Sequence, residues 1–176
     1  MRRIGTGLLL TVALVAFAAP AAFAARTSVQ ETSIQSLDRG VLAQLNEIRV
    51  SHGLVPLTLD AKLSTAAAGH SSQMLADGYF AHNSYDGSAF WKRLTAYTSS
   101  SSNGGWSVGE NLLWEAPDVN AVEALKLWMA SPEHRANILN PKWRQIGVSA
   151  IHSTAAPGTF DNQPVTVITT DFGVLG

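Results

Sequence analysis

A small set of residues that could do acid–base or metal chemistry interrupts otherwise apolar or small-residue segments. The set consists of His70, His82, Glu110, Ser131, Glu133 and His134. Imidazole and carboxylate groups exchange protons or bind divalent metals near neutral pH, so these residues suit general acid–base catalysis or a metal site. The chain has no cysteine, which excludes a thiol nucleophile. It also lacks the Gly-x-Ser-x-Gly, His-Glu-x-x-His and phosphate-loop patterns.

His134 occupies a position at which an imidazole is expected to stay uncharged. It comes about three residues into a short predicted helix, which Ser131 caps and Pro132 begins. The positive end of a helix dipole disfavours a second positive charge, so the imidazole should be neutral near pH 7 and able to bind a metal. The alternative is structural: His134 hydrogen-bonds a backbone carbonyl and Glu110 satisfies loop amides, because buried polar groups commonly stabilise a fold.

Two N-terminal helices are predicted to position part of this set. An apolar stripe at helical spacing predicts the first helix over residues 36–51. The second is predicted from its N-cap Asp60 to Asp77. His70 lies on the apolar face of this second helix, near Met74, and is expected to be a core histidine with its hydrogen bonds satisfied.

The last third of the chain changes from a helical to an alternating apolar pattern. Residues 146–152 and 165–172 predict the strands of a hairpin, after a helix over residues 119–129. The Ser- and Gly-rich residues 98–105 predict a mobile loop, beside which Trp106 is expected to line a ligand groove. Helices first and strands last predict a layered α+β domain.

Residues 1–24 predict a cleavable secretory signal. Two arginines precede an apolar run over residues 8–19, and the small residues of Ala22-Phe23-Ala24 fit cleavage after Ala24. The apolar run is short for a membrane helix, which needs about 20 residues, although an uncleaved N-terminal anchor is the alternative. The expected location is therefore secreted or extracellular.

The remainder of the chain is expected to be one near-neutral domain over residues 36–176, preceded by a flexible polar leader over residues 25–35. The formal charge of the chain is −1, so neither nucleic acid nor an anionic membrane is expected as a partner. No stretch after the signal is apolar enough to predict a transmembrane segment. Without disulfides, stability must come from packing, to which five Trp and six Phe contribute.

The order of several short motifs resembles that of one family of secreted proteins. The motifs are Leu45-Asn46-Glu47-Ile48-Arg49, Ala68-Gly69-His70-Ser71-Ser72-Gln73-Met74, Gly78-Tyr79-Phe80-Ala81-His82, Gly109-Glu110-Asn111-Leu112, Trp128-Met129-Ala130-Ser131-Pro132-Glu133-His134-Arg135-Ala136-Asn137-Ile138-Leu139, Ile146-Gly147-Val148 and Thr170-Asp171-Phe172-Gly173. Together they resemble the CAP superfamily of cysteine-rich secretory proteins, antigen 5 and plant pathogenesis-related proteins, and in particular its bacterial, cysteine-free branch. The resemblance covers residues 38–174. It implies a three-layer α-β-α sandwich with a central, mostly antiparallel sheet, and further strands near residues 79–82 and 110–114.

The family's cleft contains two histidines and two acidic residues, and the resemblance places three of these four here. His82 and His134 match the histidines, and Glu110 matches the first acid. Ser131 stands where the second acid is expected, which weakens a mechanism that needs two carboxylates. Because some family members hold a divalent metal on these histidines, His82 and His134 are the candidate metal ligands and Zn²⁺ the candidate cofactor. Glu110 would be a further ligand or the base for a bound water, and His70 and Ser131 are further cleft candidates.

Three functions are compatible with these residues. The first is an extracellular binding module for a divalent metal, a small apolar molecule, a lipid or a cell-envelope component, which the missing acid favours. The second is a metal-assisted hydrolase, such as a peptidase, in which His82 and His134 hold zinc and Glu110 acts on the bound water. The third is a structural cell-surface protein with an inert cleft. A serine nucleophile is disfavoured, because no oxyanion-hole motif accompanies the serines.

Overall fold

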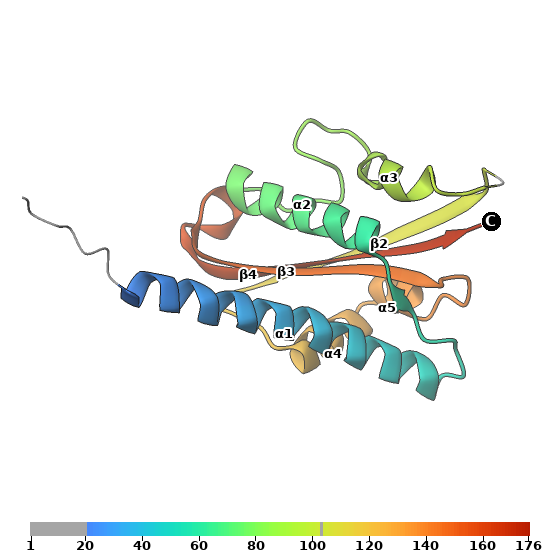
Figure 1. Cartoon of the computed structure of the whole chain (residues 1–176), viewed down its shortest axis with the longest axis horizontal. Coiled ribbons are helices and arrows are strands. Elements are labelled where there is room, and N and C mark those ends of the chain that lie inside the picture. Colours follow the sequence, from blue (N-terminus) through green and yellow to red (C-terminus); the bar gives the residue numbers. More distant parts are fainter. Residues whose placement is uncertain (1–20, 103) are drawn as a thin grey trace, which may run out of the picture.

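In the part of the chain that the computed structural model describes, residues 21–102 and 104–176, a four-stranded sheet lies between two layers of helices (Figure 1). In spatial order the strands are β1 (Thr58–Leu59), β3 (Gln145–Ala156), β4 (Gln163–Leu175) and β2 (Trp106–Glu115). β4 pairs antiparallel with both β3 and β2, and the short β1 pairs parallel with β3. The predicted α+β sandwich with a mostly antiparallel sheet is confirmed.

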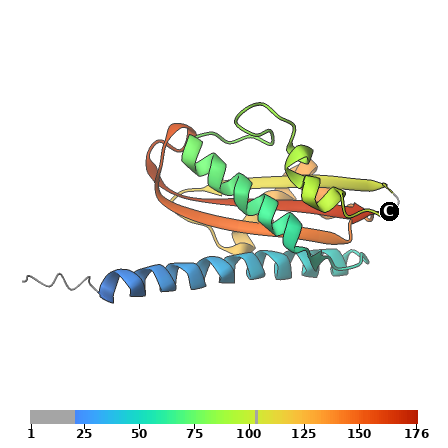
Figure 2. The same cartoon turned by 45° about the horizontal axis from the view of Figure 1, so that its top comes forward.

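The long helix α1 (Ala21–Ser51) covers one face of the sheet together with α4 (Ala121–Ala130) and α5 (Pro132–Ile138) (Figures 1 and 2). The predicted apolar stripe of α1 packs on the core. The helix begins well before residue 36 and includes residues 25–35, for which the sequence predicts a flexible leader. Ala, Gln and Glu in this stretch are good helix formers, and a helix that is already nucleated on the core extends at little cost. Residues 1–20, with most of the predicted signal, lie outside the described residues, and cleavage after Ala24 stays a prediction.

The other face is covered by α2 (Ala61–Asp77), the 3-10 helix η1 (Phe90–Leu94) and α3 (Thr95–Thr98) (Figure 2). The N-cap of α2 is confirmed, because Oδ1 of Asp60 accepts hydrogen bonds from the amides of the next turn. α2 packs closely on β3 because Gly147 has no side chain there. A Cβ at this position would overlap the backbone of Leu63.

Arg49, fully buried on α1, links this helix to the C-terminal end of α5. Its Nη1 donates to the carbonyl oxygens of Ile138 at 2.7 Å and Asn140 at 3.0 Å, and its Nε donates to that of Val55 at 3.0 Å. A charged donor that is satisfied by several carbonyls is a strong crosslink between segments. Because α5 carries His134, this contact positions one side of the candidate site.

The predicted hairpin and one of the two further predicted strands are confirmed, whereas the other strand is wrong. β3 and β4 confirm the hairpin, with the 3-10 turn η2 (Gly158–Phe160) between them, and β2 confirms the strand expected near residues 110–114. Residues 79–82 are not a strand but an irregular segment. Gly78 ends α2 at a φ of 69°, and the backbone of the following segment bonds to side chains and to α2 rather than to the sheet. No helix among the described residues is long and apolar enough to cross a membrane.

Candidate functional site

His82 lies at the end of the irregular segment after α2, and His70 holds this segment in place. The side chain of His70 is fully buried, and its Nε2 lies 3.0 Å from the carbonyl oxygen of Ala81. Because a carbonyl only accepts hydrogen bonds, Nε2 carries the proton and donates it. Burial lowers the pKa of His70, which favours this neutral form. The prediction of a core histidine with satisfied hydrogen bonds is confirmed.

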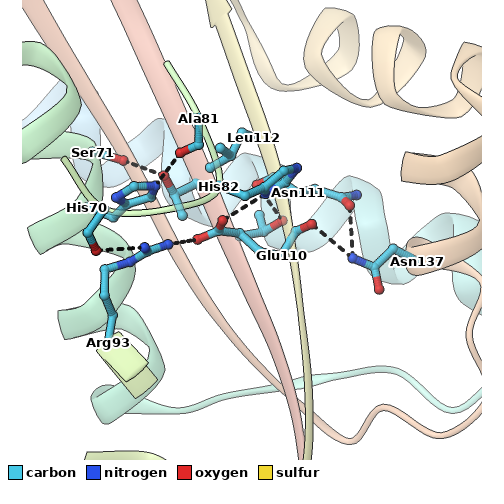
Figure 3. A network of polar contacts seen from close by, with 12 residues as sticks. His70, Ser71, Ala81, His82, Arg93, Glu110, Asn111, Leu112 and Asn137 are labelled. Atoms are coloured by element: carbon cyan, nitrogen blue, oxygen red, sulfur yellow. Dashed lines mark hydrogen bonds and ion pairs between the residues drawn. The ribbon is translucent and has the colours of Figure 1, made fainter. Parts of the chain in front are cut away.

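Glu110, on β2, is buried beneath His82 and makes two charged contacts (Figure 3). Its Oε1 lies 2.8 Å from Nδ1 of His82, and its Oε2 accepts a hydrogen bond from the Arg93 guanidinium at 2.6 Å. The side chain of Glu110 is 1% exposed, whereas that of His82 is 55% exposed. A buried carboxylate therefore accepts a hydrogen bond from Nδ1–H of His82 and orients this surface imidazole.

Asp171, on β4, lies directly opposite Glu110 in the β2–β4 ladder, so the two side chains share one face of the sheet. Neither carboxyl oxygen of Asp171 meets a hydrogen-bond donor among the described residues. Burial and then the charge of Glu110 raise the pKa of Asp171 well above its usual range, although Arg93 opposes this. Burial beside Glu110 therefore favours the protonated form of Asp171.

Asp171 and Arg93 are the site residues that the sequence analysis missed. Asp171 had a detectable signal, because it is an acidic residue within an otherwise apolar and β-branched run that predicts a buried strand. Arg93 had no such signal in the sequence, because its neighbours along the chain do not indicate which carboxylate it contacts. The guanidinium also donates from Nη1 to Oγ of Ser84 at 3.1 Å, which ties η1 to the loop after His82.

His134 lies in the first turn of α5, where Ser131 acts as the predicted cap. The Oγ of Ser131 accepts a hydrogen bond from the His134 amide at 3.5 Å and donates one to Oε2 of Glu133 at 3.2 Å. Burial and then the positive charge of His82 lower the pKa of His134, while Glu133 opposes them. The predicted preference for a neutral imidazole is supported, with burial as the leading cause.

Asn111 and Asn137 connect β2 to α5 beside this pair of histidines (Figure 3). Nδ2 of Asn111 donates to the carbonyl oxygen of His134 at 3.1 Å, and Nδ2 of Asn137 donates to that of Glu110 at 3.1 Å. The two side chains also bond to each other at 3.0 Å. The backbones of His134 and Glu110 are therefore fixed relative to one another. The predicted cleft residue Ser131 does not join these contacts between β2 and α5. It caps α5 and bonds to Glu133.

The two histidines offer fewer metal ligands than a zinc enzyme uses. Within residues 21–102 and 104–176, no three His, Cys, Asp or Glu side chains are grouped so that they could hold a metal. Both oxygens of Glu110 are engaged by His82 and Arg93. Catalytic zinc usually has three protein ligands and a water. His82 and His134 by themselves are one protein ligand short of this set.

The order of the motifs along this fold can be compared with known families. The CAP family, described as the cysteine-rich secretory protein family, matches residues 42–168. The chain belongs to the CAP family. Its lack of cysteine agrees with the cysteine-free branch that the motifs resemble.

Two similar proteins are found in Bacillus subtilis (strain 168). The uncharacterized protein YkwD is 30% identical over 127 residues, which cover 72% of this chain and 47% of YkwD. The uncharacterized membrane protein YlbC is 32% identical over 120 residues, which cover 68% of this chain and 32% of YlbC. The CAP chain described here therefore spans half or less of the length of these relatives.

Solved structures from other bacteria share the fold of this CAP domain. An extracellular protein containing a SCP domain, from Bacillus anthracis str. Ames, has a TM-score of 0.63 and 26% identity, covering 81% of this chain and 42% of its own. An outer surface protein from Borrelia burgdorferi has a TM-score of 0.63 and 19% identity, covering 77% of this chain and 90% of its own. The second similarity concerns the fold alone.

Proposed function

We propose that this CAP domain is an extracellular binding module whose binding point is the pair His82 and His134. The observation that carries the proposal is the orientation of the exposed His82 ring by the buried Glu110, which Arg93 holds from its other side. A donor that is already oriented loses less conformational entropy on binding. Export is supported by the predicted signal and by a similar protein described as an extracellular protein.

A divalent metal, alone or carried by a small molecule or cell-envelope component, is the ligand class that best suits these residues. Neutral imidazole nitrogens bind such metals, and the lowered pKa of His134 keeps that ring available near neutral pH. A carboxylate that accepts from the other ring nitrogen commonly orients a metal-binding histidine, as Glu110 does for His82. The remaining coordination positions would be filled by water or by the ligand itself.

Binding is favoured over hydrolysis by the surroundings of the two histidines. Among the described residues, no Ser or Thr hydroxyl hydrogen-bonds to a ring nitrogen of His82 or His134, which is the arrangement that an activated serine needs. Glu110 would also have to leave His82 or Arg93 before it could deprotonate a bound water. A metal-assisted hydrolase is therefore the second candidate, supported by the oriented imidazole, and an inert structural role is the third.

Calorimetric titration of the purified protein with Zn²⁺ near neutral pH tests the proposal. Wild type should bind one zinc per chain, and His82→Ala and His134→Ala should each lose this binding. His52→Ala, which removes an exposed imidazole at the end of α1, is the matched control and should bind as wild type does. The absence of wild-type binding, or its persistence in both site variants, would contradict the proposed metal site. Zinc-dependent peptide turnover that His82→Ala abolishes would instead support the hydrolase.

A further inference from the structure

Trp91, on η1, and Trp106, the first residue of β2, form a pair of exposed indoles. Each side chain is 44% exposed, the ring centroids lie 6.1 Å apart, and the ring planes are tilted by 32°. Trp128 and Trp143, by contrast, are almost completely buried in the core. Burial of an indole removes a large apolar surface from water, so two neighbouring indoles left on the surface indicate a contact area for a ligand.

Lys92 adds a positive charge at this indole pair. Its Nζ lies 5.9 Å from the ring centroid of Trp91, within the range of a cation–π interaction, and the residue is exposed. Asp86 is close enough to interact with Lys92 electrostatically, but its Oδ1 is already bonded to the amide of Ser88. The ammonium group is therefore placed to meet a ligand anion at the edge of the aromatic surface.

We propose that Trp91, Trp106 and Lys92 form a binding site for an acidic saccharide chain. One face of a pyranose ring presents C–H bonds with partial positive charge, which complement the negative face of an indole. Two exposed indoles whose centroids lie 6.1 Å apart would contact neighbouring sugar rings of one chain. The carboxylate of an acidic sugar then pairs with the ammonium of Lys92, an attraction that salt screens at an exposed position.

The size and charge of this surface favour a saccharide over other occupants. A stable contact with a second copy of the chain buries about 800 Å² on each partner, far more than two half-exposed indoles supply. An amphipathic helix that binds a membrane surface has an apolar face flanked by several Lys and Arg side chains. η1 has five residues, and its Arg93 points inward to Glu110, which leaves Lys92 as the outward cation of this element.

The saccharide site is distinct from the histidine pair, but Trp106 lies on the same strand as Glu110, which orients His82. Trp106 and Glu110 are four residues apart on β2, so both side chains lie on the face that carries η1 and α2. A short saccharide on the indoles does not require His82. Binding of a saccharide and binding of a metal can therefore be measured and lost independently.

Calorimetric titration with trigalacturonate, compared with the neutral trimer of galactose, tests the assignment. Wild type should bind trigalacturonate with an affinity that falls as salt is added, and should bind the neutral trimer more weakly. Trp91→Ala and Trp106→Ala should each abolish binding, and Lys92→Gln should reduce the affinity to that for the neutral trimer. Absence of binding, equal binding of both trimers, or undiminished binding by both Trp variants would overturn the proposal.

A control variant and an NMR titration separate recognition from folding. Leu127→Ala removes an apolar side chain of similar exposure, 42%, from α4 on the opposite layer, and should bind as wild type does. If a Trp variant fails to fold, wild type is titrated with trigalacturonate instead, and its indole N–H signals are followed by NMR. Shifts at Trp91 and Trp106 support the site, whereas shifts confined to the other indoles overturn it.

Discussion

Glu110 and Asp171 face each other across the β2–β4 ladder, and burial beside Glu110 favours the protonated form of Asp171. If both were ionised, their repulsion in a poorly hydrated interior would be severe. With Asp171 protonated, one negative charge remains, and the Arg93 guanidinium balances it. Glu110 can therefore act as a fixed carboxylate that orients His82, and this relationship supports the proposed binding function.

Asp171→Asn is expected to flatten the pH dependence of stability. Because the pKa of Asp171 is raised above 3.8 in the folded protein, its stabilising contribution is complete below that value and is lost as pH rises through the folded pKa. Asparagine cannot ionise, and its amide can donate to Glu110. Urea denaturation from about pH 4 to 9 checks this prediction, with the exposed Asp118→Asn as the control. The same loss of stability at alkaline pH in wild type and variant would contradict the raised pKa of Asp171.

Asp38→Asn should stabilise the attachment of α1 to the sheet at alkaline pH. The Asp38 Oδ1 accepts from the Ala150 amide at 2.6 Å, and burial raises its pKa to about 6, which that hydrogen bond partly opposes. The contribution of Asp38 is complete below 3.8 and is lost as pH rises through about 6. Asparagine retains the acceptor without the charge. The variant should gain up to about 1 kcal/mol in the free energy of unfolding above this range, allowing for solvent screening.

The measurement for Asp38 is a pair of urea titrations, one on the acid side and one on the alkaline side of its pKa. The gain should be confined to the alkaline side. A variant that is less stable than wild type there would show that the charge on Asp38 helps to hold α1.

His70→Phe should disturb His82 although the two side chains do not bond to each other. The variant leaves the buried carbonyl of Ala81 without its donor, at a cost of about 1–3 kcal/mol in the free energy of unfolding. The segment that carries His82 then becomes less ordered, and zinc binding should weaken. His70→Gln keeps an N–H donor and should restore part of both properties. Wild-type zinc affinity in His70→Phe would show that His70 does not position His82.

Glu133→Gln should lower the pKa of His134 further. The charge of Glu133 raises this pKa, against the opposing effects of burial and His82, so its removal leaves the lowering effects unopposed. An NMR titration of the His134 ring protons measures the shift, and Glu123→Gln on α4 serves as the exposed control. A higher pKa in Glu133→Gln would mean that Glu133 acts through the Ser131 cap rather than through its charge.

Much of the fold and part of the site could be predicted, because the sequence patterns that indicate them are local. The caps at Asp60 and Ser131 act within one helical turn, and the alternation over β3 and β4 reflects the two faces of each strand. The burial of His70 followed from helical spacing. The strand expected over residues 79–82 was wrong, because an apolar run does not show whether the sheet has a place for it.

The sequence by itself identified this chain as a cysteine-free CAP domain and predicted His82, Glu110 and His134 as its site residues. Tertiary structure alone decided that Asp171 faces Glu110 and that Arg93 forms an ion pair with Glu110. It also decided that Trp91 lies beside Trp106 on the surface. These contacts join residues that are far apart in the chain. Their protonation and exposure depend on burial and neighbouring charge, which exist only once the strands have paired and the helices have packed.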